Sequence, residues 1–235
     1  MYFNDQYFME KIAVIVAGGS GVRMGSHLPK QFLLLDNQPI LLYTLQTFFA
    51  AFEDMQVILV LPAAYFEAGE TMIRSLPQYQ RIQIVAGGDT RFHSVQSGLA
   101  AISSKTDAVI FVHDGVRCLL STKLIQQCYH QAIEKGSAIP AIKATDSIRQ
   151  LKDQTSIPIN RDEIYLMQTP QTFKSSILLP AFQMPYQASF TDEATVVEHS
   201  GVSIHLIEGE YQNIKITRPI DLLIAQKFLE DPSLF

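Results

Sequence analysis

Short, continuous apolar runs recur along this 235-residue chain, and they constrain its fold more than any other feature. A strand that is apolar at successive positions must be covered on both faces, as strands of parallel sheets are. Segments with helical periodicity lie between most of these runs. The expected strands are residues 12–17, 56–61, 81–86, 108–113, 137–142, 203–207 and 213–217, and the expected helices are residues 40–51, 65–75, 92–103, 122–135, 192–199 and 219–229.

The alternation of strands and helices predicts one α/β domain over residues 1–235, with a mostly parallel sheet and helices on both faces. A hydrophobic content of 47% with 17% charged residues is typical of a globular protein. The formal charge of −5 argues against a nucleic-acid-binding surface.

The cysteines and the apolar runs also bear on the compartment. Cys118 and Cys128 have no clustered His or Cys partners, so we expect reduced thiols in a cytoplasmic protein. The first ten residues lack the pattern of a signal peptide. No run approaches the roughly 20 apolar residues that a membrane span needs.

Residues 144–169 interrupt the α/β pattern. Two strand-like runs flank a turn around residues 152–154, which predicts a β-hairpin with too little apolar content to bury both faces. Such a hairpin is either a solvated excursion or an arm that contacts another subunit. Spacing alone favours the excursion.

A glycine-rich loop follows the first apolar run, in the sequence AGGSGVRMGSHLPKQ of residues 17–31. Glycines let backbone N–H groups surround an anion, and Arg23 and Lys30 can neutralise it. The loop lacks the Gly-Lys-Ser/Thr of a Walker loop and the third glycine of a dinucleotide fingerprint. It therefore indicates another kind of polyphosphate site, the alternative being a tight turn with two solvated cations.

Polar residues also follow other predicted strands, and ligands of parallel sheets gather beyond these carboxyl ends. Residues 87–91 follow the third strand, Asp114 and Arg117 the fourth, and Lys215 lies in the last. Taken singly, each of these polar residues has a plain structural explanation, such as a turn or a helix cap. Together on one edge they predict a nucleotide site with fixed cations and a carboxylate for ribose or hydrated Mg²⁺.

The residues present also limit the types of reaction that the site could catalyse. No Ser-His-Asp order, paired-carboxylate signature or activated cysteine supports covalent or glycosidic hydrolysis. Phosphoryl and nucleotidyl transfer need positioning and neutralisation of charge at phosphorus, which Arg, Lys and Mg²⁺ supply.

Seven ordered motifs carry a resemblance to a known family. From residue 11 to residue 229 the chain resembles the 2-C-methyl-D-erythritol 4-phosphate cytidylyltransferases of the non-mevalonate isoprenoid route. The motifs are AGGSGVRMG, PKQF at residues 29–32, GGD-x-R at 87–91, HD-x-x-R at 113–117, QTPQ at 168–171, TDEA at 191–194 and NIKITRP at 213–219.

The resemblance implies a Rossmann-like nucleotidyltransferase fold with a protruding β-arm at about residues 144–167. It also implies transfer of the cytidylyl group of CTP to methylerythritol phosphate, with Mg²⁺ and release of diphosphate. By similarity, Arg23, Lys30 and Lys215 would be catalytic. The residues that would bind CTP are Ala17, Gly18, Gly19, Gly88, Asp89, Ser94, Asp114 and Gly115, with Asp114 also near the metal.

The resemblance further implies a homodimer whose arm delivers Arg161 to the partner's site. It therefore reverses the interpretation from spacing, which favoured a solvated excursion for the hairpin. The acceptor residues would be Arg117, Ser147, Arg161, Thr169 and Thr191. Ser147 replaces the usual threonine and keeps the hydroxyl. Cys118 stands where a proline is common, which predicts a looser turn with a thiol near the nucleotide.

Three alternatives share part of this evidence. A ribitol 5-phosphate cytidylyltransferase has the same fold and reaction and differs in the acceptor. A non-catalytic nucleotide-binding protein would have lost at least one phosphate cation, yet Arg23, Lys30 and Lys215 are all present. A uridine or purine sugar pyrophosphorylase would prefer UTP or ATP to CTP.

Overall fold

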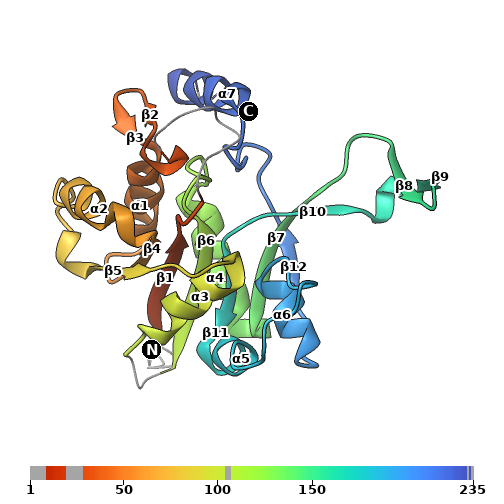
Figure 1. The fold of residues 1–235 in the computed structure, drawn as a ribbon, viewed down its shortest axis with the longest axis horizontal. Coiled ribbons are helices and arrows are strands. Elements are labelled where there is room, and N and C mark those ends of the chain that lie inside the picture. Colours follow the sequence, from red (N-terminus) through yellow and green to blue (C-terminus); the bar gives the residue numbers. More distant parts are fainter. Residues whose placement is uncertain (1–8, 20–28, 104–106, 232, 234–235) are drawn as a thin grey trace, which may run out of the picture.

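The computed structural model describes residues 9–19, 29–103, 107–231 and 233, and its centre is a mixed eight-stranded sheet (Figure 1). Four strands run parallel in the order β6-β1-β4-β5, and β11 lies antiparallel between β6 and β7. The predicted mostly parallel sheet is therefore confirmed. The strands are β1 (Glu10–Val16), β4 (Gln56–Leu61), β5 (Ile82–Ala86), β6 (Ala108–Asp114), β7 (Ser137–Lys143), β10 (Tyr165–Met167), β11 (Gln171–Lys174) and β12 (Leu206–Glu208).

The continuous apolar runs are explained by helices on both faces of the sheet. In β1, Ala13 and Ile15 pack into one core cluster, while Ile12 and Val14 pack into the other. The first cluster is covered by α1 (Ile40–Ala51), α2 (Phe66–Ile73) and α4 (Thr122–Lys135). The second is covered by α3 (Arg91–Ala100), α5 (Ser175–Ala181) and α6 (Glu193–His199).

A third cluster lies beside the carboxyl edge of the sheet. It joins α7 (Pro219–Glu230) to the short pair β2 (Leu34–Leu35) and β3 (Gln38–Pro39) and to Val116 and Ile216. This cluster supports the segment that carries Lys215, so α7 has a direct bearing on the site.

Helix ends follow local sequence signals. Ser121 accepts a hydrogen bond from the Leu124 N–H at the start of α4, and Gly136 closes that helix with a φ of 89°. This left-handed position favours glycine. The predicted helix at residues 122–135 is confirmed at both ends.

One expected strand is absent from the structure, and two elements of the structure were not expected. Residues 213–217 form no strand, because among the backbone N–H groups there only Ile216 reaches a neighbouring segment, donating to the Val116 carbonyl at 3.0 Å. The sequence analysis also missed β11 and α5, since β11 has only four residues, three of them polar, and α5 contains Pro180.

The predicted hairpin is present and projects from the body of the molecule (Figure 1). Its strands are β8 (Ile148–Lys152) and β9 (Thr155–Ile159), and the turn residues Asp153 and Gln154 have φ values of 47° and 63°. Leu151 is 74% exposed. No described helix is long and apolar enough to cross a membrane.

Candidate active site

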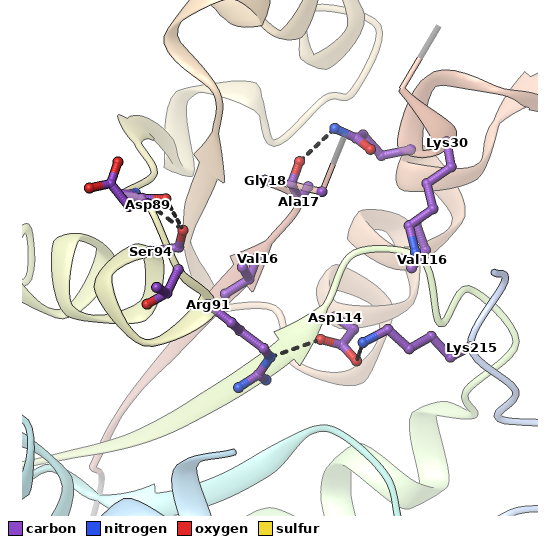
Figure 2. Close-up of a pocket in the computed structure, with 14 residues that line it drawn as sticks. Val16, Ala17, Gly18, Lys30, Asp89, Arg91, Ser94, Asp114, Val116 and Lys215 are labelled. Carbon is purple, nitrogen blue, oxygen red and sulfur yellow. Dashed lines mark hydrogen bonds and ion pairs between the residues drawn. The ribbon is translucent and has the colours of Figure 1, made fainter. Parts of the chain in front are cut away.

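A pocket of about 490 Å³ opens at the carboxyl edge of the sheet (Figure 2). Register explains its position, because Val16 of β1 pairs with Asp114 of β6 and with Val60 of β4, so these strands end together. Its lining comes from five segments. The lining residues are Val16, Ala17, Gly18, Gly19, Lys30, Gln31, Gly88, Asp89, Thr90, Arg91, Ser94, Asp114, Val116 and Lys215.

The wall after β1 is held by the segment that carries Lys30. Lys30 begins a short 3-10 helix, Lys30–Phe32. The buried Gln31 side chain donates from Nε2 to the Ala17 carbonyl at 2.6 Å, and Lys30 Nζ donates to the Ile216 carbonyl at 3.2 Å. Lys30 therefore lies beside the segment that bears Lys215.

The wall after β5 leads into α3. The N–H of Gly88 donates to Ser94 Oγ at 3.2 Å, and Ser94 Oγ donates back to the Gly88 carbonyl at 3.3 Å. A Cβ on Gly88 would lie 2.5 Å from the Cβ of His93, so the close approach of the loop to α3 requires glycine here. Thr90 caps α3 by accepting from the His93 N–H.

Asp114 is the electrostatic centre of the pocket, because three cations contact its carboxylate. Lys215 Nζ lies 2.9 Å and Arg117 Nε 3.4 Å from Oδ2, and Arg91 Nε lies 3.3 Å from Oδ1. Burial opposes ionisation of Asp114, but Arg91, Lys215 and Arg117 outweigh it and hold its pKa well below the usual range. The carboxylate is therefore charged at neutral pH.

A buried histidine and threonine hold the backbone behind Asp114. Nε2 of His113 faces the Arg117 carbonyl at 3.1 Å, and a carbonyl only accepts, so Nε2 carries the proton. Thr169 Oγ1 then donates to Nδ1 at 3.0 Å and accepts from the Asp114 N–H at 3.1 Å. Burial lowers the pKa of His113 to about 3, so the ring is neutral.

Arg91 connects this centre to α6. Its Nη1 and Nη2 both donate to the Glu193 carboxylate, with Nη2 at 3.0 Å from Oε2, while Nε faces Asp114. Burial disfavours the charged form of Arg91, but Glu193 and Asp114 outweigh burial and raise its pKa. Glu193 is 1% exposed and does not line the pocket.

Most of the predicted nucleotide residues meet at this pocket. Gly115 lies just behind its wall, where a Cβ would be 3.1 Å from the Cβ of Ala17. Arg23 lies outside the described residues. The predicted residues that line the pocket are Ala17, Gly18, Gly19, Lys30, Gly88, Asp89, Ser94, Asp114 and Lys215.

The predicted acceptor residues fall into two groups. Arg117 and Thr169 contact Asp114 from behind the lining, and Arg117 also donates to the Asn213 carbonyl at 2.8 Å. Ser147, Arg161 and Thr191 are exposed and are not pocket-lining residues of this chain. Arg161 instead donates to the Thr145 carbonyl at 2.9 Å, at the base of the arm.

The thiol that was expected near the nucleotide does not itself line the pocket. Cys118 is 4% exposed and packs with Val116, which lines the pocket, and with Leu119 and Ile216. Burial raises the pKa of its thiol to about 12.

The described side chains of this pocket could hold a metal ion only together with a bound substrate that supplies further coordinating atoms. Within the described part of the chain, no group of three or more His, Cys, Asp and Glu is placed to bind a metal. Asp114 lines the pocket, where Lys215 and Arg117 contact Oδ2 and Arg91 contacts Oδ1, so Oδ1 keeps an acceptor position. Mg²⁺ commonly binds through one or two carboxylates plus substrate phosphates. The residues thus fit a Mg²⁺ that enters with a triphosphate.

The sequence analysis placed Arg91 at the edge of the sheet without giving it a role, and it gave no role to Gln31 and Glu193. All three stand inside the motifs GGD-x-R, PKQF and TDEA, so the signal was present. Their partners were not visible, because Arg91 and Glu193 are 102 positions apart.

Comparisons with known proteins agree with this geometry. The family model described as "IspD: 2-C-methyl-D-erythritol 4-phosphate cytidylyltransferase" matches residues 11–231. The protein of that name from Bacteroides fragilis is 41% identical, with 94% of this chain and 100% of the relative covered. Its namesake from Porphyromonas gingivalis strain ATCC 33277 is 40% identical, with 94% and 98% covered.

Solved structures show the same fold. The 4-diphosphocytidyl-2C-methyl-D-erythritol synthase of Anaerococcus prevotii superposes with a TM-score of 0.82 at 26% identity, covering 94% of this chain and 96% of that one. The 2-C-methyl-D-erythritol 4-phosphate cytidylyltransferase of Francisella tularensis gives 0.77 at 30% identity, with 92% and 99% covered. The pocket, the fold and the full-length match together establish that this chain belongs to the 2-C-methyl-D-erythritol 4-phosphate cytidylyltransferase family.

Proposed function

We propose that this protein transfers the cytidylyl group of CTP to 2-C-methyl-D-erythritol 4-phosphate, giving 4-CDP-2-C-methyl-D-erythritol and diphosphate in the non-mevalonate isoprenoid route. The observation that carries the proposal is the pocket at the carboxyl edge of the sheet, where Lys30 and Lys215 flank a glycine-lined wall. Relatives at 40–41% identity over nearly the whole chain bear the name of this activity.

The nucleotide half of the pocket suits a triphosphate. Gly18 and Gly19 offer open backbone after β1, and Lys30 lies against the same wall. Gly88, Asp89 and Ser94 form the opposite wall, where we assign the base and ribose. Arg23 belongs to the same loop in sequence and is proposed as a further phosphate cation.

The reaction is an in-line attack by the acceptor phosphate on the α-phosphorus of CTP. That phosphate oxygen is anionic at neutral pH, so no general base is required. Lys30 and Lys215 neutralise charge that grows on the α-phosphate oxygens and the leaving diphosphate, as preorganised cations do in phosphoryl transfer. Asp114 keeps Lys215 oriented through their 2.9 Å contact. When bound with CTP, Mg²⁺ would be held by Asp114 and the phosphates and would add further neutralisation.

The acceptor half is proposed to be completed by a second copy of the chain. Arg161 is exposed and away from its own pocket, and it can bind a phosphate bidentately. The arm also exposes Leu151 at 74% and Ile157 at 44%, which a partner would cover. We therefore propose a homodimer in which Arg161 and Ser147 serve the partner's acceptor, together with Arg117, Thr169 and Thr191. A cytoplasmic location remains a prediction.

The proposal is tested by measuring diphosphate release from CTP with purified protein and Mg²⁺. We expect turnover with 2-C-methyl-D-erythritol 4-phosphate and none with ribitol 5-phosphate. Turnover with ribitol 5-phosphate and none with 2-C-methyl-D-erythritol 4-phosphate would show that ribitol 5-phosphate is the acceptor. CTP binding without diphosphate release from either acceptor would make the protein a non-catalytic binder.

A further inference from the structure

Arg91 lines the nucleotide pocket, and Figure 2 shows its guanidinium turned toward the Asp114 carboxylate. Its two terminal nitrogens donate to Glu193, and Nε faces Asp114 Oδ1 at 3.3 Å. A guanidinium that faces a carboxylate end-on is held in one plane. Arg91 is therefore not placed as a free cation that waits for phosphate.

Glu193 accepts hydrogen bonds from Arg91 but does not itself line the pocket. It is 1% exposed and is absent from the pocket lining. It is the first residue of α6, whose start is fixed by the side chain of Asp192 and by Gln171, which accepts from the Ala194 N–H at 2.8 Å. The carboxylate thus lies at the anchored start of α6, outside the pocket lining.

A chain of contacts runs from Glu193 to a proposed catalytic cation. Glu193 holds the Arg91 guanidinium, Arg91 Nε faces Asp114 Oδ1, and Asp114 Oδ2 lies 2.9 Å from Lys215 Nζ. The side chain of Lys215 is 37% exposed, so it depends on Asp114 for its orientation. Movement of the carboxylate would move the ammonium group of Lys215 in the pocket.

We propose that Arg91 and Glu193 are positioning residues, which form a buried clamp between α3 and α6 that fixes the Asp114 carboxylate and through it Lys215. This inference rests on the proposed function, because Lys215 acts on the phosphate of CTP. The clamp affects the chemical step more than nucleotide binding. A misplacement of about 1 Å at a reacting group can cost about 100-fold in rate.

The test uses Glu193→Gln, Arg91→Lys and the double variant Arg91→Met/Glu193→Leu in the full-length protein. Glu193→Gln leaves the buried Arg91 cation without this partner, which can prevent folding, whereas Arg91→Lys keeps the charge and loses the two-point donation to Glu193. The double variant removes both charges together, a replacement that buried ion pairs often tolerate. Thr195→Ala is the matched control, because it removes the other half of the α6 capping box without touching the pocket.

Two quantities are measured for each variant: kcat from diphosphate release and the Kd for CTP by calorimetry. We expect kcat to fall by about 100-fold in the double variant and in each single variant that folds, while the Kd for CTP stays at the wild-type value. Similar losses in single and double variants would show that the two residues act as one unit. Thr195→Ala should keep wild-type kcat.

Two results would overturn the inference. A folded double variant with near wild-type kcat would make the pair purely structural. If Arg91→Lys loses CTP binding while Glu193→Gln binds CTP as tightly as the wild-type protein, Arg91 is itself a phosphate ligand. Absence of diphosphate release from the wild-type protein would instead refute the proposed function, so the two failures are distinguishable.

Discussion

Replacing Asp114 by asparagine removes one negative charge from the centre of three cations. Arg91, Arg117 and Lys215 lie 3.3, 3.4 and 2.9 Å from its carboxylate, which is 9% exposed. Asparagine keeps the size of the side chain but offers one acceptor oxygen and an NH₂ group that faces a cation. We expect Asp114→Asn to lower both stability and turnover.

The stability loss follows from the burial of these groups. Removing one partner of a buried ion pair costs about 3–5 kcal/mol. We expect a loss at the lower end of this range, because Lys215 is 37% exposed and solvent screens its interaction with Asp114. A loss of about 3 kcal/mol in a domain of this size corresponds to a fall of about 6–12 °C in Tm.

Turnover should fall for a separate reason. Without Asp114 the ammonium group of Lys215 is no longer held at 2.9 Å from a carboxylate, and loss of orientation costs about 100-fold in kcat. Inorganic diphosphate should restore part of the Tm deficit, since the added anion compensates the uncovered cations and stabilises the folded state that binds it.

The assay compares Tm by calorimetry and kcat by diphosphate release for the wild-type protein, Asp114→Asn and Asp107→Asn. Asp107 is exposed and precedes β6 at the opposite end of the strand from Asp114, so it is a matched control for the same chemical change. If Asp114→Asn is as stable and as active as Asp107→Asn, the role given to Asp114 is refuted.

Four further outcomes are expected. Lys30→Ala and Arg23→Ala should each lose about 3–4 kcal/mol of transition-state stabilisation in kcat/KM while remaining folded; near-normal turnover would contradict the mechanism. Arg161→Ala should raise the KM for the acceptor and not for CTP, and mixed dimers that carry one dead site each should recover activity if the residue acts across the interface. His113 has a folded pKa of about 3, below its unfolded value of about 6.5, so the unfolded chain takes up the proton first. The free energy of unfolding in urea titrations should therefore fall by about 1.6 kcal/mol more from pH 6.5 to 5 in the wild-type protein than in His113→Gln; equal slopes would refute this. Cys118, whose pKa is raised to about 12 by burial, should resist iodoacetamide at pH 8 until the protein is denatured, as mass spectrometry would show.

Much of the fold could be predicted from local patterns. The runs that became β1 and β4 are apolar at successive positions because each strand contributes to two core clusters. The helix at residues 122–135 carries its own start and stop signals in Ser121 and Gly136. In each case the signal lies within the segment that it describes.

Other elements depended on neighbours far away in sequence. The four-residue β11 is a strand because it fits between β6 and β7, and residues 213–217 are not, although their composition favours one. Strand pairing is a long-range interaction, so short or isolated segments carry too little local information to decide it.

The sequence by itself determined the glycine-rich loop, the cations that accompany it, the family and the strand ends at which polar residues gather. Only the tertiary structure decided how these groups are paired. It placed Asp114 among three cations, joined Arg91 to Glu193 across 102 positions, and put Cys118 in an apolar cluster. The reason is physical: residue types and spacing specify which charges reach an edge of the sheet, but the packing of α3 and α6 against that sheet sets the distances between them.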